Sequence, residues 1–365
     1  MPKVTLQTIA DRLGVSRATV SYAFSRPDQL SEGLRQRILQ VADELGYAGP
    51  NPTARSLRLG RAGALGLIFT ETLAYAFADP YSIGFLQGLA TAAEDAGAGL
   101  LILPLPHGDR RSETVRDAVV DSFCVMSLPD GHPAMAEVLA RKLPVVIVDE
   151  PYVPGHPFVG TDEPAAGAAA ARHVLELGHR RVGVVMAGLH EDGHTGWSGR
   201  ERQEGAVFAA MRARRGGYQR ACEEAGLDWW GGVPFYEVAR NSREAGRRAG
   251  HALLGRDPRP TAVLANTDVL ALGVLDAAAD LGLDVPGELS VVGFSDSAAE
   301  EAGLTTVRQA RQEIGETAGR LLLSGALLSG AAAGRPAAAE PERLILPHRL
   351  IVRATTAPPP PEGRR

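Results

Sequence analysis

Apolar residues near the N-terminus recur with the period of two short helices joined by a tight turn. Thr5 is placed to cap the first helix, and Gly14 ends it because glycine accepts the left-handed backbone of a sharp turn. Ser16 is placed to cap a second helix that begins at Arg17. The apolar face of the first helix repeats at i, i+3, i+4 and i+7 and consists of Leu6, Ile9, Ala10 and Leu13.

A third helix follows Ser31 and is expected to pack on the first two. Its apolar stripe consists of Leu34, Ile38, Val41, Ala42 and Leu45, and the second helix adds Val15, Val20 and Phe24 to the same core. The outward face of the second helix then consists of Arg17, Ala18, Ser21 and Tyr22. This arrangement predicts a helix-turn-helix, whose second helix enters the major groove of DNA. A small three-helix bundle without a DNA-binding role is the alternative.

Charge separates this segment from the rest of the chain. Residues 1–61 hold nine Lys or Arg and five Asp or Glu, a net charge of +4, whereas all 365 residues together carry −5. The remainder therefore carries −9. A basic head on an acidic body is typical of a protein that presents only its head to a polyanion, and this favours double-stranded DNA as a partner.

From residue 62 short apolar strands alternate with longer helices, which predicts parallel sheets covered by helices on both faces. We expect two such sheets, with the chain crossing between them near 160–164 and 305–309, and a ligand cleft at the carboxyl ends of their strands. Helices are expected at Ser82–Ala96, Glu163–Leu177, Ser242–Leu254 and Val269–Leu281. The expected strands are Ala64–Phe69, Leu100–Pro104, Phe123–Leu128, Val145–Asp149, Val182–Met186, Val233–Val238, Ala262–Ala265 and Leu289–Phe294.

Composition narrows the class of protein. A hydrophobic content of 45% supports a sizeable core, and the two cysteines are too few for a disulfide framework or a thiolate metal site. The N-terminus lacks the pattern of a secretory signal, and no run is long enough to span a membrane. We therefore expect a cytoplasmic protein with no membrane partner and no cofactor. The proline-rich tail 357–365 is expected to be disordered.

One segment matches the sequence motif of zinc proteases. His190-Glu191-Asp192-Gly193-His194 matches HExxH, whose chemistry requires both histidines on one face of a helix. Four glycines within 188–199 instead predict a loop, so we expect no metal site here.

The ordered segments VTLQTIADRLGVSRATVS, LSEGLRQRILQVADELGY and NPTARSLRLGRAG resemble the DNA-binding head of the lactose-repressor (LacI/GalR) family of bacterial transcription regulators. The resemblance implies that Arg17, Ala18 and Tyr22 read bases. It places Thr5, Ser16, Thr19, Ser21 and Tyr47 toward phosphates, and Leu6 also lies in the expected DNA-binding set. The family commonly has Arg where this chain has Tyr22, which implies a different operator half-site because a phenol lacks the fork that reads guanine.

Residues 51–58 resemble the hinge helix of that family, with Thr53, Ala54, Leu57 and Arg58 in the expected DNA-binding set. Two copies would pack on DNA, and Leu57 would wedge between base pairs in the minor groove. The alternative is an ordinary linker with Leu57 packed on the body. Gly49-Pro50 adds one residue to the usual spacing of the family.

The body resembles the periplasmic-binding-protein-like effector domain of the same family, in segments such as PVVIVDEP, PTAVLANTDVLALGVLDAAADLGL and VPGELSVVGFSDS. The resemblance implies a small-molecule effector, such as a sugar, held by Asp149, Arg212, Asp268 and Ser295, with Tyr75 and Phe77 stacking on it. The alternatives are purely structural roles: loop packing for the two aromatic residues, and a salt bridge for Asp149 and Arg212. Thr267 and Ser295 replace an Asn and an Asp that commonly hold sugar hydroxyls in the family. This weakens the expectation that the effector is a plain hexose.

Together these features predict an all-α helix-turn-helix head joined to a two-lobed α/β effector domain. The expected domains are 1–48 (head), 49–61 (hinge) and 62–356, with one lobe at 62–162 plus 308–330 and the other at 163–306 plus 331–356. We expect a homodimeric repressor that binds an operator and an effector. An enzyme and a sugar-binding transport protein are the alternatives, but the chain lacks a dinucleotide fingerprint, a phosphate loop and a nucleophile elbow.

Overall fold

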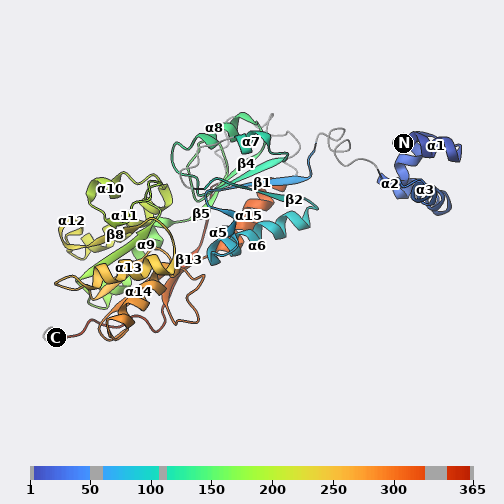
Figure 1. The fold of residues 1–365 in the computed structure, drawn as a ribbon. Coiled ribbons are helices and arrows are strands. Elements are labelled where there is room, and N and C mark those ends of the chain that lie inside the picture. The colour runs from blue at the N-terminus through green and yellow to red at the C-terminus, as the bar shows by residue number, and fades with distance from the viewer. Residues whose placement is uncertain (1–3, 50–60, 107–112, 325–342, 362–365) are drawn as a thin grey trace. The chain divides into compact units, whose positions relative to one another are not determined.

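The computed structural model describes residues 4–49, 61–106, 113–324 and 343–361, and these form two compact units (Figure 1). The head extends to Gly63 and the body begins at Ala64. None of the helices within the described ranges is long and apolar enough to cross a membrane. The hinge segment falls outside these ranges, and so do its expected DNA contacts at Thr53, Ala54, Leu57 and Arg58.

The head contains the three expected helices, α1 (Leu6–Leu13), α2 (Arg17–Ser25) and α3 (Glu32–Glu44), with a 3-10 turn, η1, at Pro27–Gln29. The Thr5 side chain accepts a hydrogen bond from the Thr8 N–H, and the Thr8 hydroxyl oxygen accepts one from the Thr5 N–H. Gly14 ends α1 in the left-handed conformation at φ 67°, and Ser16 accepts from the Thr19 N–H. Ser31 occupies the cap position of α3 without a side-chain cap bond.

The core of the head confirms the apolar pattern. Its fully buried residues come from all three helices, and the other expected apolar residues pack around them at partial exposure. The buried set consists of Ile9, Ala10, Val20, Ala23, Ile38 and Ala42.

The body holds two sheets built mainly from parallel strands. The first sheet has the order β12-β5-β4-β3-β1-β2 and is parallel throughout. The second has the order β13-β11-β10-β9-β6-β8-β7, with antiparallel strands only at its two edges. The strands are β1 (Ala64–Phe69), β2 (Gly99–Pro104), β3 (Ser122–Met126), β4 (Val145–Val148), β5 (Phe158–Thr161), β6 (Val182–Ala187), β7 (Gly196–Trp197), β8 (Phe235–Val238), β9 (Ala262–Ala265), β10 (Ser290–Ser295), β11 (Thr305–Gln309), β12 (Arg343–Leu346) and β13 (His348–Ile351).

Helices cover both faces of each sheet, as the alternating pattern predicts. In the first lobe α6 and α15 cover one face and α7 and α8 the other; in the second lobe α9 and α11 face α13 and α14 across the sheet. Three short helices, α5, α10 and α12, lie in connections. The ranges are α5 (Leu73–Ala76), α6 (Pro80–Asp95), α7 (Glu113–Asp117), α8 (Pro133–Ala140), α9 (Glu163–Glu176), α10 (Arg200–Glu204), α11 (Ala209–Glu224), α12 (Trp229–Gly232), α13 (Arg243–Leu254), α14 (Asp268–Asp280) and α15 (Arg311–Leu323).

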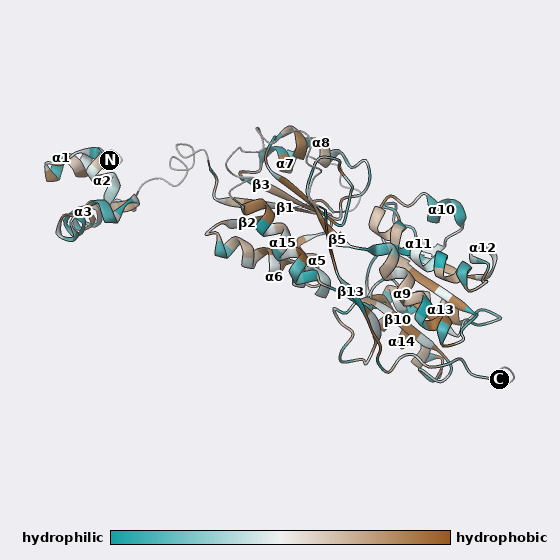
Figure 2. Cartoon of the chain, turned by 180° about the vertical axis from the view of Figure 1, so that it is seen from behind, coloured by the Kyte–Doolittle hydropathy of each residue, from teal (hydrophilic) through white to brown (hydrophobic). Residues whose placement is uncertain are grey.

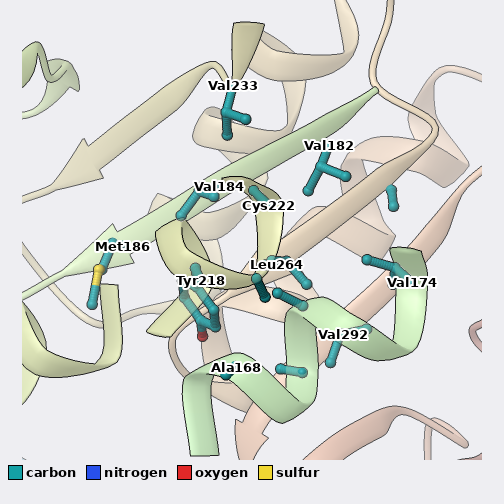
Figure 3. Close-up of a cluster of buried hydrophobic side chains, with 14 of the residues drawn as sticks. Ala168, Val174, Val182, Val184, Met186, Tyr218, Cys222, Val233, Leu264 and Val292 are labelled. Carbon is teal, nitrogen blue, oxygen red and sulfur yellow. The ribbon is translucent and has the colours of Figure 1, made fainter. Parts of the chain in front are cut away.

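The cores lie between these layers. Figure 2 shows hydrophobic colouring along the strands at the centre of both lobes and hydrophilic turns on the helices. In the second lobe, Tyr218 and Cys222 of α11 and Val174 of α9 point toward Val184 and Leu264 of the sheet (Figure 3). Burial of these apolar surfaces is the main source of stability in such a layered fold.

The structure differs from three expectations about the lobe boundaries and the C-terminal tail. Residues 343–346 were assigned to the second lobe, but β12 pairs with β5 in the first sheet, so the chain changes lobe again between β12 and β13. Arg308 and Gln309 were assigned to the first lobe but belong to β11 of the second sheet. The tail is also ordered at its start, because the Ala357 carbonyl accepts hydrogen bonds from His179 and Ser290.

Candidate functional site

The second helix of the head leaves polar residues uncovered on one face. Arg17, Ala18 and Tyr22 are exposed, the last with 39% of its surface accessible, whereas Val20 and Ala23 turn inward. Three of the five phosphate-facing candidates are anchored locally: Thr5 and Ser16 act as helix caps, and Thr19 and Ser16 share a 2.8 Å hydrogen bond. The face that the resemblance assigns to DNA is therefore formed by rigid, capped helices.

Tyr47, the fifth candidate, packs on the second helix of the head. Its ring meets the Phe24 ring edge-on with centroids 5.8 Å apart. Partial burial raises the pKa of Tyr47, and the nearby Arg17 charge opposes this effect. The phenol thus stays neutral, as a hydrogen-bond donor to a phosphate must.

The body contains a cavity of about 190 Å³ between its two sheets, at the carboxyl ends of their strands. The first lobe lines it through residues that follow β1, β3 and β4, and the second lobe through residues that follow β6, β8, β9 and β10. Tyr75, Asp149 and Ser295 from the expected effector set are among its lining residues. Asp149 and Ser295 both adopt positive φ, at 61° and 101°, which is rare for residues with side chains and is typical of functional sites.

Asp149 directly follows β4, and its carboxylate receives few hydrogen bonds from the protein. Its Oδ2 accepts a 3.2 Å hydrogen bond from the Tyr81 hydroxyl, while its Oδ1 is buried without a partner in the described part of the protein. Burial, and after it the neighbouring Glu163, raise the pKa of Asp149 to about 7 against the opposing effects of Tyr81 and Arg214. Asp149 therefore titrates near neutrality.

Arg214 supplies the guanidinium of the cavity. Its Nε donates to Glu163 at 2.7 Å and its Nη1 donates to the Asn266 carbonyl at 2.7 Å, while the guanidinium lies 3.6 Å from the centre of the Phe294 ring. Burial lowers the pKa of Arg214, but the charge and hydrogen bond of Glu163 outweigh this and leave it raised. The group is a fixed cation in the wall of the cavity.

The expected cleft arginine, Arg212, was therefore misplaced by two residues. Arg212 does not line the cavity; it pairs with Asp130 at 3.0 Å and donates to the Ala206 carbonyl. A step of two residues turns a helical side chain through about 200° at 3.6 residues per turn, so Arg212 and Arg214 face nearly opposite ways.

Asp268 and Phe77 were also assigned wrongly to the lining. Asp268 is fully buried and accepts from the Thr306 hydroxyl at 2.6 Å and the Ser297 N–H at 2.6 Å, so it holds the loop that follows β10. Burial raises the pKa of Asp268 in spite of these bonds. Phe77, which directly follows α5, is 65% exposed and lies outside the lining, whereas Tyr75 of α5 is part of it.

The sequence analysis missed Asn241 and Glu150, which make hydrogen bonds between the lobes at the cavity. The Asn241 amide donates to the Tyr75 hydroxyl at 2.8 Å, and Asn241 accepts in turn from the Thr267 hydroxyl at 2.6 Å. Glu150 of the first lobe accepts from the Ala210 N–H at the start of α11, at 2.8 Å. Burial raises the pKa of Glu150 to about 8. Polar contacts thus link the two lobes at the cavity.

The HExxH-like string lies in a loop, as the glycines predict. His190 donates to the Arg202 carbonyl, and the His194 N–H donates to Asp192. Arg202 holds this loop to the body through Asp192 and the buried Glu237. Over the ranges that the structure describes, no group of three or more His, Cys, Asp or Glu is placed to hold a metal ion.

Comparison with known proteins gives the same two-part division. Residues 5–51 match the model of bacterial regulatory proteins of the lacI family, and residues 171–356 match a periplasmic binding protein-like domain. The HTH-type transcriptional regulator IpsA of Corynebacterium glutamicum is 41% identical over 324 residues, which cover 87% of this chain and 90% of that protein. The chain belongs to the LacI family. It is a transcription regulator with a DNA-binding helix-turn-helix domain, and its relatives are regulators rather than enzymes.

Solved structures of LacI-family regulators share this fold. A LacI-family regulator from Corynebacterium glutamicum superposes with a TM-score of 0.72 at 35% identity, covering 98% of this chain and all of that one. The regulator CelR in complex with cellobiose gives a TM-score of 0.65 at 26% identity, covering 97% of this chain and all of that one. The HTH-type transcriptional repressor CytR of Escherichia coli K12 is 30% identical over 87% of this chain and 89% of its own length.

Proposed function

We propose that this LacI-family regulator is a cytoplasmic homodimeric repressor that reads a near-palindromic operator and releases or tightens on it when a small polar effector enters the cavity. The observation that carries the proposal is the pairing, in one chain, of an exposed recognition face with a polar cavity at the strand ends of two lobes. The relative CytR is named a repressor and the neighbour CelR is described with a bound sugar, which supports both parts.

In this proposal Arg17 and Tyr22 read bases, and the capped ends of α1 and α2 fix the angle of the reading helix. A dimer would present two such helices to two half-sites, one helical turn of DNA or a multiple apart. The hinge segment, with Leu57, would add a minor-groove contact.

Asp149, Arg214, Tyr75 and Ser295 are the proposed effector contacts. The effector would replace or reinforce contacts between the lobes, such as the bond from Asn241 to Tyr75. It shifts the lobe angle only in so far as it prefers one arrangement over the other.

A gel-shift titration with the DNA upstream of the chain's own gene tests the proposal. We expect a discrete complex with the full chain and none with a variant that lacks residues 1–60. The matched control is the same fragment with both halves of its inverted repeat scrambled. Equal affinity for the native and scrambled fragments, or an unchanged complex after deletion of the head, would contradict the proposal.

A further inference from the structure

Carboxyl groups dominate the charge of the cavity wall. Among the described lining residues the only side chains that carry or accept a positive charge are Arg214 and His190. Arg214 is already paired with Glu163, which also accepts from Gln309 at 2.9 Å. The carboxyl groups of the lining are Glu71, Asp79, Asp149, Glu150 and Glu163.

The hydrogen-bond donors that stabilise the negative charge of these carboxyl groups are unevenly distributed among them. Asp79 caps α6, accepting from the Ser82 N–H at 2.9 Å, and Glu150 accepts from the N–H of Ala210 at the start of α11. Both therefore lie at the positive end of a helix dipole. Asp149 receives only the Tyr81 hydroxyl, and its Oδ1 is buried with no partner within the described ranges.

The Asp149 carboxylate is part of the cavity wall, on a residue that is partly exposed, and the only side chain of the described residues that donates to it is the Tyr81 hydroxyl. Burial, and after it the neighbouring Glu163, raise the pKa of Asp149 to about 7 against the opposing effects of Tyr81 and Arg214. A ligand with a positive charge would give this carboxylate a further hydrogen bond and a counter-charge.

Aromatic rings form a second feature of the same wall. Their faces attract cations, and a carboxylate beside aromatic rings is a common environment for an ammonium group. An anionic ligand would instead be repelled by the excess of carboxylates. The rings that line the cavity are those of Phe69, Tyr75, Tyr81 and Phe208.

We propose that the effector carries a protonated amine that binds the Asp149 carboxylate, and that it is a polyhydroxylated amine about the size of one sugar ring. The inference rests on the effector site proposed above. The cavity of about 190 Å³ has the volume of roughly six water molecules, which suits a ligand of that size. Hydroxyl groups of the ligand would meet Arg214, Ser295 and Asn241.

Calorimetry on the full-length protein at pH 7 tests the charge preference. The probes are glucosamine, galactosamine and mannosamine, the three neutral parent hexoses, and the corresponding uronates. We expect at least one amino sugar to bind tenfold or more tightly than its neutral parent, and its uronate to bind least. Binding of a neutral hexose or a uronate as tight as that of its amine overturns the inference, and so does a failure of all three amines to bind.

The variant Asp149→Asn separates charge from shape, because the two side chains are nearly isosteric. It should lower the affinity for the amine at least tenfold and leave the affinity of the neutral parent within threefold. Asp130→Asn, which removes a carboxylate outside the cavity, is the matched control and should change neither. Equal losses for amine and parent in Asp149→Asn would show that Asp149 is structural and would overturn the inference.

A parallel gel shift keeps the two proposals distinguishable. If the amine binds but leaves operator affinity unchanged, the effector role in the proposed function fails while the ligand chemistry stands. If a neutral hexose both binds and changes operator affinity, the proposed function stands and the amine does not.

Discussion

Gly217 on α11 lies so close to Pro164 on α9 that a Cβ atom at Gly217 would overlap the Pro164 carbonyl oxygen. Gly167 makes the reciprocal approach to the Arg214 carbonyl. This close contact of the two helices brings the Glu163 carboxylate, at the start of α9, to within 2.7 Å of the Arg214 guanidinium. The cavity cation is thus positioned by glycines that never touch a ligand.

Gly217→Ala should therefore destabilise the body by about 1–3 kcal/mol, since an added methyl group in a close-packed interface forces the backbones apart. Gly216→Ala is the matched control, because a Cβ at the adjacent position meets nothing within 4 Å. Denaturant unfolding measures both. Equal stability of the two variants would contradict the close approach of α9 and α11.

Exchanging Arg214 should affect the effector response and exchanging Arg212 should not. Arg214→Lys keeps the charge that Glu163 needs but loses the planar fork that holds a ligand by two hydrogen bonds. For Arg214→Lys we expect at least a tenfold rise in the effector concentration that gives half of the maximal change in operator binding. Arg212 pairs with Asp130 outside the cavity, so Arg212→Ala should keep this concentration near its wild-type value. A gel shift with effector titration measures this, and the reverse ranking would restore Arg212 as the cleft arginine.

The helical pattern of α11 contained the signal that distinguishes these two arginines. Counted from Ala210, its buried residues fall at i, i+4, i+5, i+7, i+8, i+11 and i+12, and Arg214 lies on that stripe while Arg212 does not. Family spacing ahead of Gly217 and Tyr218 pointed to Arg212, whereas helix periodicity points to Arg214, the arginine that lines the cavity.

Local patterns predicted the head and the central strands because caps, turns and periodicity act between residues a few positions apart. The lining of the cavity depends on contacts between distant parts of the chain, such as Tyr75 with Asn241, 166 residues later. Position at a strand end does not show whether a carboxylate faces the cavity, as Asp149 does, or holds a loop, as Asp268 does. Edge strands such as β12 and β13 are short and half exposed, so their apolar pattern is weak.

Asp149 and Glu150 should make the protein less stable as the pH rises. The pKa of Asp149 is raised from 3.8 to about 7 in the folded state, so the fold binds this proton more tightly than the unfolded chain does. The destabilisation is absent below about pH 4 and develops up to about pH 7, with a slope of at most about 1.4 kcal/mol per pH unit for each fully linked group. For Glu150 the corresponding window runs from about pH 4.5 to about 8.

Thermal unfolding of wild type and Asp149→Asn between pH 5 and 8.5 measures this effect. The difference in unfolding free energy should grow in favour of the variant up to about pH 7 and then level off. Histidines such as His173 and His179, whose pKa values burial lowers, contribute equally to both proteins and cancel in the difference. A difference that does not change with pH would show that Asp149 keeps its ordinary pKa.

Arg17→Ala should weaken binding to the cognate operator by about 1–3 kcal/mol and relax the preference at one base pair, since an Arg fork reads guanine in the major groove. Arg37→Ala, in the middle of α3, is the control for loss of one positive charge from the head. Binding to a library of half-site variants measures both changes. The same loss on every sequence would mean that Arg17 contacts phosphate only.

The salt dependence of DNA affinity should show that the head makes the nonspecific contacts with DNA. The head region up to Arg61 carries +4 and the remainder −9, so nonspecific affinity should come from the head alone. If each monomer neutralises about five phosphates, log K should fall with log salt at a slope of roughly −4.5 per monomer. Fluorescence anisotropy with operator and random duplexes, from low to physiological salt, measures the slope.

The affinity for random DNA should fall as steeply with salt as the affinity for operator, because phosphate contacts are common to both. The two affinities should differ by a nearly constant factor, which measures the contribution of base contacts. A shallow slope for either duplex would show that the basic head does not act through phosphates.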